Sequence, residues 1–222
     1  MLTVHHLNNS RSQRILWLLE ELELKYNIKR YERDPETLLA PDSLRKIHPL
    51  GKSPVVTDGE LTLAESGAIV EYLVNSYGDG SLIPAEDTPE KRRYTYWLHY
   101  AEGSAMPPLV MKLVLGQVEK KAMFLLRPLA KAVTGQIKSA FAEPQIKLHL
   151  GYMENELAKT TWFAGDEFTA ADIQMSFPIE AASTEPDFSV NYKKLLAFLD
   201  RIHSRPAYQK ALERGGEYQV LS

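Results

Sequence analysis

Apolar positions follow two different periods in the first 77 residues. Short apolar runs predict strands, and longer stretches with apolar residues three and four positions apart predict helices. The expected order begins with a strand at Leu2–Leu7, a helix from about Ser12 to Glu23 and a strand within Lys25–Glu32. A polar loop with a short helix follows at Asp34–His48. Two strands at Pro54–Thr57 and Glu60–Leu63 then flank Asp58-Gly59 as a hairpin, and Glu65-Ser66-Gly67 opens the last helix. This order predicts a small β-α-β-α-β-β-α domain.

The strand pattern ends at the glycine-containing stretch Tyr77–Pro84, and only helical patterns follow it. The expected helices run from Pro89 to about Val118 with a break or kink at Met106-Pro107-Pro108, then over Lys120–Ala142, Pro144–Lys159, Thr169–Ser183 and Tyr192–His203, with a short last helix that starts at Arg205-Pro206. We therefore predict a fold of the α/β + all-α class. It has an α/β domain at residues 1–78, a linker at 79–88 and an all-helical domain at 89–222.

The composition is that of an ordinary globular protein, with 222 residues, 44% hydrophobic and 25% charged. The net charge is −3, so nucleic acid is not the expected partner, and pairs such as Lys120-Lys121 are interpreted as solvated helix faces. Because 18 consecutive apolar residues and a signal-peptide pattern are both absent, we expect no membrane partner. The chain has no cysteine, which excludes disulfides and thiol nucleophiles and fits a reducing compartment, with the cytoplasm as the expected location.

The histidines and glycines do not indicate a bound cofactor. None of the six histidines has a histidine partner four residues away on a helix, and no acidic motif accompanies them, so a metal site is not expected. His5 and His6 are expected to alternate inward and outward along the first strand. The dinucleotide fingerprint and the phosphate loop are both missing, so no nucleotide cofactor is expected.

Two short segments of the first domain have the chemistry of a binding site. Ser10-Arg11-Ser12 lies where a strand meets a helix N-terminus, a position that favours anions and thiolates, although a plain N-cap is an equal alternative. At Leu50–Val55, a cis Ser53–Pro54 bond would aim the backbone N–H and C=O of Val55 outward, toward a peptide ligand that adds a strand. From the sequence alone we favour a trans proline that only starts an edge strand.

The third such segment is Glu65-Ser66-Gly67, which opens a helix. A carboxylate and a hydroxyl at a helix N-terminus match an amino-acid head group. Ser66 and the helix N–H groups would bind its carboxylate, and Glu65 its amine. The alternative is ordinary capping, because serine is common at that position for the helix's own sake.

Taken together and in this order, the three segments resemble the glutathione S-transferase superfamily. The resemblance covers nearly the whole chain and includes Gly165–Asp172, where Thr169 would be the N-cap and Asp172 its capping-box partner. It implies a thioredoxin-like first domain and a helical second one. It also implies glutathione as the co-substrate, conjugation to small hydrophobic electrophiles or glutathione-dependent peroxide reduction, and a homodimer. The subgroup resembled is cysteine-free, serine-type, and found in bacteria and fungi.

In that family the glutathione thiol meets a hydroxyl or thiol near the end of the first strand. This chain has no cysteine, and no tyrosine before residue 23. Ser10 stands four residues before Arg14, the spacing of the serine classes, and is our first choice for the thiol contact. Asn9, Arg11 and Ser12 remain as rivals. A hydrogen bond and the helix dipole would stabilise the thiolate without a metal or a general base.

The resemblance also implies the remaining contacts. Glutathione would meet Lys52 at its glycine carboxylate and Val55 at its cysteinyl backbone, with Ser53 and Pro54 beside it. Glu65 and Ser66 would bind its γ-glutamyl head, while Glu102 would reach the partner subunit's glutathione. The electrophile would lie against Tyr100, Met106, Leu109, Val110 and Leu113 on the long helix. The same fold also serves as a non-catalytic binding module, and the Glu65-Ser66 pair favours glutathione binding over that alternative.

Overall fold

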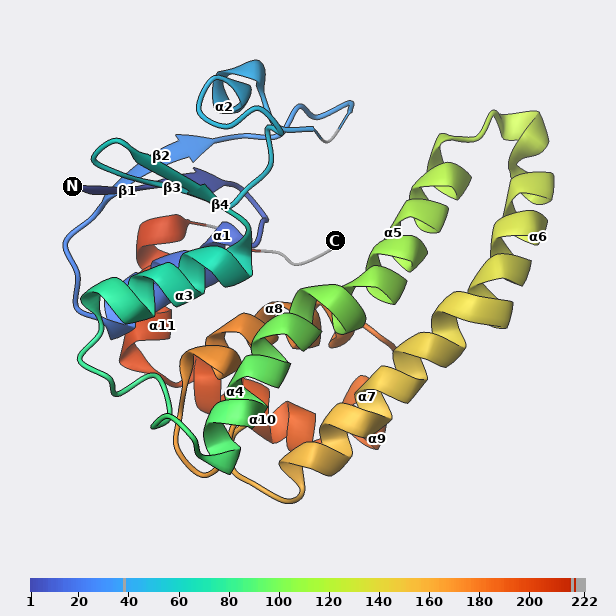
Figure 1. Ribbon diagram of the computed structural model, residues 1–222. Coiled ribbons are helices and arrows are strands. Elements are labelled where there is room, and N and C mark those ends of the chain that lie inside the picture. Colours follow the sequence, from blue (N-terminus) through green and yellow to red (C-terminus); the bar gives the residue numbers. More distant parts are fainter. Residues whose placement is uncertain (38, 217, 219–222) are drawn as a thin grey trace.

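The first domain is a four-stranded mixed sheet with the strand order β2-β1-β3-β4. A computed structural model of the chain describes residues 1–37, 39–216 and 218 (Figure 1). Strands β1 (Leu2–Leu7) and β2 (Asn27–Tyr31) are parallel, and β3 (Val55–Asp58) runs antiparallel to β1 and to β4 (Leu61–Ala64). In this register Val4 lies opposite both Ile28 and Val56, so the central strands are apolar where they face the helices.

Three helices complete the first domain: α1 (Ser12–Glu21), α2 (Asp42–Arg45) and α3 (Ser66–Tyr77). Helix α1 is buried along almost its whole length, with residues 15 to 19 fully inaccessible. It lies against β1, α3 and α8, and against α11 near the end of the chain. The site residues that precede α1 are therefore held between the sheet and the second domain. The observed order confirms the predicted β-α-β-α-β-β-α domain.

His5 and His6 do not alternate between buried and exposed, as the sequence suggested, because both are only 4% exposed. Their side chains do leave β1 on opposite faces, since His5 Nδ1 lies 2.9 Å from the Tyr31 hydroxyl and His6 Nδ1 lies 2.8 Å from Ser12 Oγ. Strand β1 is internal, so neighbouring strands and helices cover both of its faces. The expectation was wrong because it treated β1 as a strand with one solvated face.

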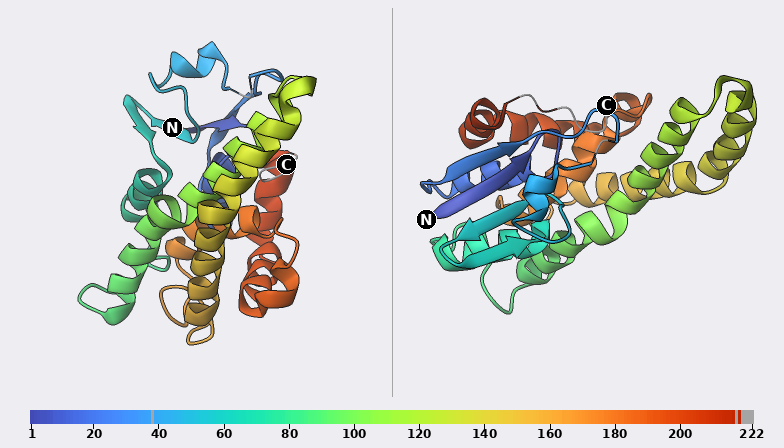
Figure 2. Two further views of the ribbon diagram at one scale, coloured as in Figure 1. Left: turned by 90° about the vertical axis from the view of Figure 1, so that its right-hand side faces the viewer. Right: turned by 90° about the horizontal axis from the view of Figure 1, so that it is seen from above.

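The second domain is helical throughout its described residues, as predicted. Its elements are α4 (Pro89–Tyr100), a π-helical turn (Ala101–Ala105), α5 (Met106–Lys121), a 3₁₀ turn (Phe124–Leu126), α6 (Arg127–Ile137), a second π-helical turn (Lys138–Ala142), α7 (Glu143–Leu157), α8 (Ala170–Ala182), α9 (Phe188–Asn191), α10 (Lys193–His203) and α11 (Pro206–Gly215). Helix α8 is buried at every position and lies in the middle of the domain (Figures 1 and 2). Residues 78–88 contain no helix or strand, which fits the predicted linker, while the division into domains stays a prediction.

The helix boundaries between residues 118 and 144 differ from the expectation. The chain turns at residues 122–126, and the helix that follows runs through Pro144 without a stop. Short helix α9 was not predicted at all. Pro144 removes one backbone hydrogen bond from this continuous helix, and the π-helical turn before it makes room for the proline ring. The turn at 122–126 lacks the glycine signal from which sequence reasoning infers loops.

Both π-helical turns come immediately before prolines. The first precedes Pro107-Pro108 and the second precedes Pro144. A proline ring clashes with the carbonyl group four residues earlier, and a wider π turn moves that carbonyl away. The predicted kink near Met106 therefore takes the form of a π bulge. Each extra residue rotates the following helix face by about 100°, which matters for the residues that face the first domain.

The predicted capping box at the start of α8 is present. Asp172 is fully buried, and its carboxylate accepts hydrogen bonds from the backbone N–H groups of Phe163 and Thr169, both at 2.9 Å. Burial raises the pKa of Asp172 to about 6, against the opposing effect of these donors. The box fixes the loop before α8 and, through it, the joint between the two domains.

Candidate functional site

Ser10 lies at the centre of a chain of hydroxyl groups between β1 and α1. Its Oγ is 2.8 Å from Ser12 Oγ and 3.1 Å from Ser53 Oγ, and Ser12 Oγ is in turn 2.8 Å from His6 Nδ1. Ser10 is 3% exposed and Ser12 is fully buried. The loop thus joins the end of β1, the start of α1 and the turn before β3 through side-chain hydrogen bonds.

The imidazole of His6 is neutral at pH 7. Burial and, to a smaller extent, the charge of Arg30 lower the pKa of His6 to about 4. A neutral imidazole has one nitrogen that donates and one that accepts, so its tautomer sets the direction of every hydrogen bond in the chain of hydroxyls. Sequence analysis did not assign His6 to the site. Its position four residues before the favoured serine was the only available signal.

The other two candidates lie nearer the surface. Asn9 is exposed and has a positive φ of 47°, a conformation that asparagine tolerates better than most residues. Arg11 is half-buried, and its Nε lies 3.0 Å from Glu102 Oε2. Of the four candidates for the thiol contact, Ser10 and Ser12 are thus hydrogen-bonded to each other, while Arg11 belongs to a charged group.

That charged group lies at the junction between the two domains. Arg14 is 2% exposed, donates through one terminal nitrogen to the carbonyl oxygen of Gln174 at 2.6 Å, and forms an ion pair with Glu102. Glu102 comes from the first π-helical turn and contacts both Arg11 and Arg14, which lie three positions apart at the start of α1. Burial lowers the pKa of Arg14, and the charge of Glu102 opposes this shift.

Two glutamine side chains are buried in this part of the molecule, Gln174 beside Arg14 and Gln13 beside Gly215 of α11. In the part of the chain that the structure describes, the side-chain oxygen and nitrogen of Gln13 and of Gln174 lack hydrogen-bond partners, as does Arg14 Nε. Gln13 is 2% exposed and Gln174 1%. Gln174 also lies close to the N-terminus of α3, because a Cβ added to Gly67 would be 3.7 Å from its Nε2. Arg14 and Gln174 were not predicted as site residues, since their burial depends on how the domains pack.

The peptide bond before Pro54 is cis, so the trans expectation was wrong. The energy difference between the two isomers of an X–Pro bond is only about 0.5–1 kcal/mol, and tertiary packing therefore decides between them. Val55 lies inside the sheet, opposite His5 on one side and Ala64 on the other. Ser53 precedes the strand and places its hydroxyl beside Ser10, whereas the side chain of Lys52 is exposed.

The Glu65-Ser66 pair has an unusual backbone. Glu65 has φ 71° and ψ 121° and is exposed, while Ser66, the first residue of α3, is 3% exposed. A positive φ in a residue other than glycine, asparagine or aspartate is strained and is concentrated at functional sites. The side chain of Glu65 makes no capping hydrogen bond to the helix that Ser66 begins, so the two side chains do not form an ordinary capping pair.

A cavity of about 480 Å³ opens between the charged group and α5. Its lining comes from one face of α5 together with Arg11 and Glu102, and consists of Arg11, Glu102, Met106, Pro107, Val110, Met111, Val114 and Leu115. Two of the five predicted electrophile residues, Met106 and Val110, line it. Tyr100 and Leu109 are buried in the core, and Leu113 is also not among the lining residues. The π bulge accounts for the shift, because it rotates α5 relative to a regular helix.

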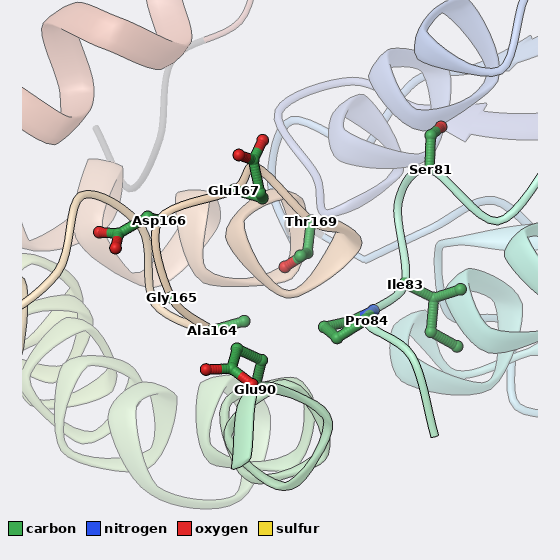
Figure 3. Close-up of a pocket in the computed structure, with 9 residues that line it drawn as sticks. All are labelled: Ser81, Ile83, Pro84, Glu90, Ala164, Gly165, Asp166, Glu167 and Thr169. Atoms are coloured by element: carbon green, nitrogen blue, oxygen red, sulfur yellow. The ribbon is translucent and has the colours of Figure 1, made fainter. Parts of the chain in front are cut away.

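A second cavity, of about 360 Å³, lies away from this site (Figure 3). Pro84 of the segment between the domains lies toward Ala164 of the loop before α8, with Ile83 on its far side and Glu90 of α4 nearby. None of the predicted site residues lines it. Among the described residues, no group of three or more histidines, aspartates or glutamates is placed to hold a metal ion.

Two family models match the chain. The glutathione S-transferase N-terminal domain matches residues 1–75, and the glutathione S-transferase C-terminal domain matches residues 109–206. The chain belongs to the glutathione S-transferase family. Among its relatives, "Glutathione S-transferase 3" of Schizosaccharomyces pombe is 40% identical over 96% of this chain and 88% of its own length. "Glutathione S-transferase 1" of Saccharomyces cerevisiae is 34% identical over 96% of this chain and 95% of its own length.

A solved glutathione S-transferase from Actinobacillus pleuropneumoniae has the same fold, with a TM-score of 0.78 and 32% identity over 100% of this chain and 95% of its own. These findings confirm the predicted superfamily, the fold and the enzyme class, a glutathione transferase with glutathione as co-substrate. These comparisons concern the whole chain and not the roles of individual residues. In the described part of the chain, no helix is both long and apolar enough to span a bilayer.

Proposed function

We propose that this transferase binds glutathione as a thiolate beside Ser10 and conjugates it to apolar electrophiles held against α5. The observation that carries the proposal is the position of Ser10 Oγ. It lies at the N-terminal end of α1, 2.8 Å from Ser12 Oγ, within a network that His6 and Ser53 complete. A hydroxyl fixed in this way is a preorganised donor for sulfur.

The available interaction energies are sufficient to stabilise the glutathione thiolate. A free thiol has a pKa of roughly 8.5, and lowering it by about two units requires roughly 2.7 kcal/mol of preferential stabilisation of the anion. One charge-assisted hydrogen bond contributes about 1.5–3 kcal/mol, and the dipole of α1 adds about 0.3–1 kcal/mol. Ser10 thus acts as a donor and not as a base, and the thiolate attacks the electrophile directly.

One arrangement of the hydrogen atoms in the chain of hydroxyls lets Ser10 donate a hydrogen bond to sulfur. This arrangement requires the tautomer with its proton on Nδ1, in which His6 donates to Ser12 Oγ and gives up its hydrogen bond with the backbone of Gly215. Ser12 then donates to Ser10 Oγ, which leaves the hydroxyl hydrogen of Ser10 free to point at the ligand. Ser53 yields its place beside Ser10 to the sulfur, because its hydroxyl also lies 3.4 Å from the carbonyl oxygen of His5. His6 and Ser12 are positioning residues in this arrangement.

The rest of glutathione follows the edge of the first domain. The glycine carboxylate pairs with the exposed ammonium group of Lys52, and the γ-glutamyl head lies at the N-terminus of α3, where Ser66 and Glu65 bind its carboxylate and amine. We propose that the backbone N–H and C=O of Ser53, which precedes Pro54 and Val55 in the chain, form hydrogen bonds with the cysteinyl backbone. Val55 already has a strand on each side, so its own backbone groups face the sheet.

Glu102 supports the site from within its own subunit. Arg14 and Arg11 both bind its carboxylate, so the proposed role is to hold the loop that carries Ser10 against the second domain. Its predicted contact with the partner subunit's glutathione stays a prediction. The electrophile lies in the cavity lined by Met106, Val110 and their neighbours, and a peroxide in the same place would be reduced by the same thiolate.

We further propose a homodimer that works in the cytoplasm as a detoxifying enzyme. Reduced glutathione is maintained in the cytoplasm, and an apolar cavity suits electrophiles of varied structure. The second copy would cover an apolar stripe along α6 and α7, whose side chains are 42–63% exposed and are Val133, Ile137, Phe141 and Leu148. Size-exclusion chromatography with light scattering tests the dimer, and Ile137→Asp is expected to shift it toward the monomer.

A pH titration of the protein–glutathione complex, followed by the ultraviolet absorbance of the thiolate, tests the mechanism. We expect a bound-thiol pKa about two units below that of free glutathione and a return toward the free value in Ser10→Ala, with a loss of about 10- to 100-fold in kcat/KM. Ser43→Ala, an exposed hydroxyl on α2, is the matched control. Binding with an unshifted pKa would contradict the thiolate mechanism and indicate a non-catalytic glutathione-binding module.

A further inference from the structure

The turn between α5 and α6 exposes an unusual number of large apolar side chains. Four consecutive residues and one in the next turn are 53–82% exposed: Met123, Phe124, Leu125, Leu126 and Leu129. The two helices project from the body of the second domain, and this turn is at their far end (Figures 1 and 2). Contiguous exposed apolar surface of this kind marks an interaction site and not a folding core. We call these five residues the hairpin tip.

The tip is held in a defined conformation. The backbone N–H groups of Leu126 and Arg127 donate to the carbonyl oxygen of Met123 at 2.8 and 3.0 Å, and Arg127 Nε donates to the carbonyl oxygen of Ala122 at 3.2 Å. At the base of the tip, Lys138 Nζ lies 2.7 Å from Glu119 Oε1 and ties α5 to the helix that follows. The apolar side chains are therefore presented by an ordered turn, so no collapse of a loose loop will bury them.

Cations surround the tip. Residues 120–142 carry five basic residues and no acidic one, in a chain whose net charge is −3. Lys120, Lys121, Arg127 and Lys131 are exposed, and Glu119, the nearest acidic residue along the chain, is already paired with Lys138. Lys121 Nζ also donates to the carbonyl oxygen of Glu36 at 3.0 Å, which joins this end of the hairpin to the first domain. Sequence analysis interpreted these lysines as a solvated helix face, because it placed the apolar residues between them inside a helix.

We propose that the hairpin tip docks on an anionic lipid surface, with its apolar side chains in the interfacial layer and the surrounding cations at the headgroups. A convex apolar turn ringed by lysine and arginine matches the two requirements of interfacial binding, apolar area and positive charge. A second copy of this chain fits less well, because a two-fold contact between two tips would bring like charges together. The bound form is peripheral and does not span the bilayer.

Docking through the tip has a consequence for the site. The apolar face of α5 that contains Val110, Val114 and Val118 runs from the cavity toward the tip. An apolar electrophile dissolved in the lipid would reach the cavity along this face. This consequence rests on the proposed function, whereas the docking itself does not.

Tryptophan fluorescence tests the docking directly. Trp17, Trp97 and Trp162 are all buried, so Phe124→Trp adds a single exposed reporter to the full-length protein. Vesicles of phosphatidylcholine with phosphatidylserine are expected to shift its emission to the blue and to sediment the wild-type protein. Pure phosphatidylcholine vesicles and high salt should reduce the bound fraction about tenfold.

Matched variants distinguish docking through the hairpin tip from nonspecific binding to vesicles. Phe124→Asp/Leu125→Asp should abolish sedimentation, while Val190→Asp on α9, at the opposite end of the second domain, should leave it unchanged. Lys120→Glu/Lys131→Glu should weaken binding at least tenfold, in contrast to the exposed control pair Lys46→Glu/Arg92→Glu. Glutathione binding on the same preparations reports on the catalytic site independently.

Three results would overturn the proposal. Wild-type protein that stays in the supernatant with anionic vesicles is the first, and equal sedimentation of Phe124→Asp/Leu125→Asp is the second. The third is Phe124→Trp emission that is blue-shifted without vesicles and moves to the red on dilution, which would show that another copy of the chain covers the tip. If docking fails while glutathione still binds with a shifted thiol pKa, the proposed function stands without it.

Discussion

The junction beneath Ser10 and the tip of the α5–α6 hairpin depart from the usual distribution of residues in opposite directions. At the junction, Arg14, Gln13 and Gln174 are 1–2% exposed although all three are polar. At the tip, Phe124 and Leu125 are 80% and 82% exposed although both are strongly apolar. The first region buries groups that water would stabilise, and the second exposes groups that water disfavours.

The two departures have different energetic consequences. A buried charge or amide lowers the stability of the fold unless its partners are in place, so the junction is sensitive to every contact it makes. An exposed apolar side chain on an ordered turn has little effect on folding and matters only when something covers it. The junction should therefore respond to mutation through stability and catalysis, and the tip through association alone.

The largest effect is expected for Arg14→Leu. The change removes two charge-assisted hydrogen bonds, one to the buried carbonyl oxygen of Gln174 and one to the Glu102 carboxylate, which is 29% exposed and keeps Arg11 as a partner. Because each such hydrogen bond contributes at most about 1.5–3 kcal/mol, we expect a loss of about 3–4 kcal/mol. Urea unfolding measures the loss. Arg45→Leu, which removes the exposed pair with Asp42 at 3.8 Å, is the control and should change stability by less than about 0.5 kcal/mol. Similar losses for both variants would show that the junction is not special.

The second effect concerns pH and His6. In the unfolded chain His6 has the ordinary histidine pKa of 6.5, whereas in the fold its pKa is about 4. On account of His6 the unfolded state binds more protons between these values, so this group makes stability fall as the pH drops from 6.5 to 4, by up to about 3 kcal/mol. Burial lowers the pKa of His5 as well, and its effect has the same sign. Asp172, whose pKa burial raises to about 6, contributes with the opposite sign below pH 6.

Urea unfolding at several pH values across that window measures the slope. His6→Gln should flatten it, and His99→Gln, on the exposed side of α4, should leave it unchanged. A slope that is the same in wild type and His6→Gln would mean that His6 is not the neutral buried group on which the network depends.

A smaller effect of opposite sign is expected for Gln174→Met. Both side-chain polar atoms of Gln174 are buried without partners in the described part of the chain, so an apolar side chain of similar size removes a desolvation penalty. Thermal unfolding should show a gain of about 1 kcal/mol. If the variant is instead less stable and glutathione binding weakens, Gln174 makes hydrogen bonds through ordered water or through the ligand.

The smallest effect is expected for Leu125→Ser at the tip. Its side chain is 82% exposed, so the free energy of unfolding should change by no more than about 0.5 kcal/mol. A loss of more than about 1 kcal/mol would show that the tip is packed in the native protein and would remove the contrast between the two regions.

Local signals in the sequence were sufficient for the elements with strong patterns. The run Leu2–Leu7 is strand β1 with the same bounds, and Thr169 and Asp172 form the predicted capping box. These features depend on residues close together in the chain, where side-chain period and capping chemistry act directly. The same holds for Ser10 at the end of β1 and for Ser66 at the start of α3, whose positions follow from the elements they join.

Features that depend on residues far apart in the chain could not be predicted from the sequence. The isomer of the Ser53–Pro54 bond, the burial of both His5 and His6, and the contact of Arg14 with Gln174 across 160 positions all depend on how separate elements pack. The face of α5 that lines the cavity was displaced by a π bulge, which no period in the sequence reveals. The apolar run at 123–126 was assigned to a helix, and only the fold placed it at the tip of a projecting hairpin.

The sequence by itself determined the fold class and the family, and it predicted the segments that we propose to surround glutathione, because hydrophobic period, caps and turn residues are local properties. The tertiary structure decided which side chains meet, which polar groups are buried together and which apolar groups stay in water. Those outcomes depend on the relative placement of the sheet, α1, α8 and the α5–α6 hairpin, and placement is fixed by packing among all of them at once.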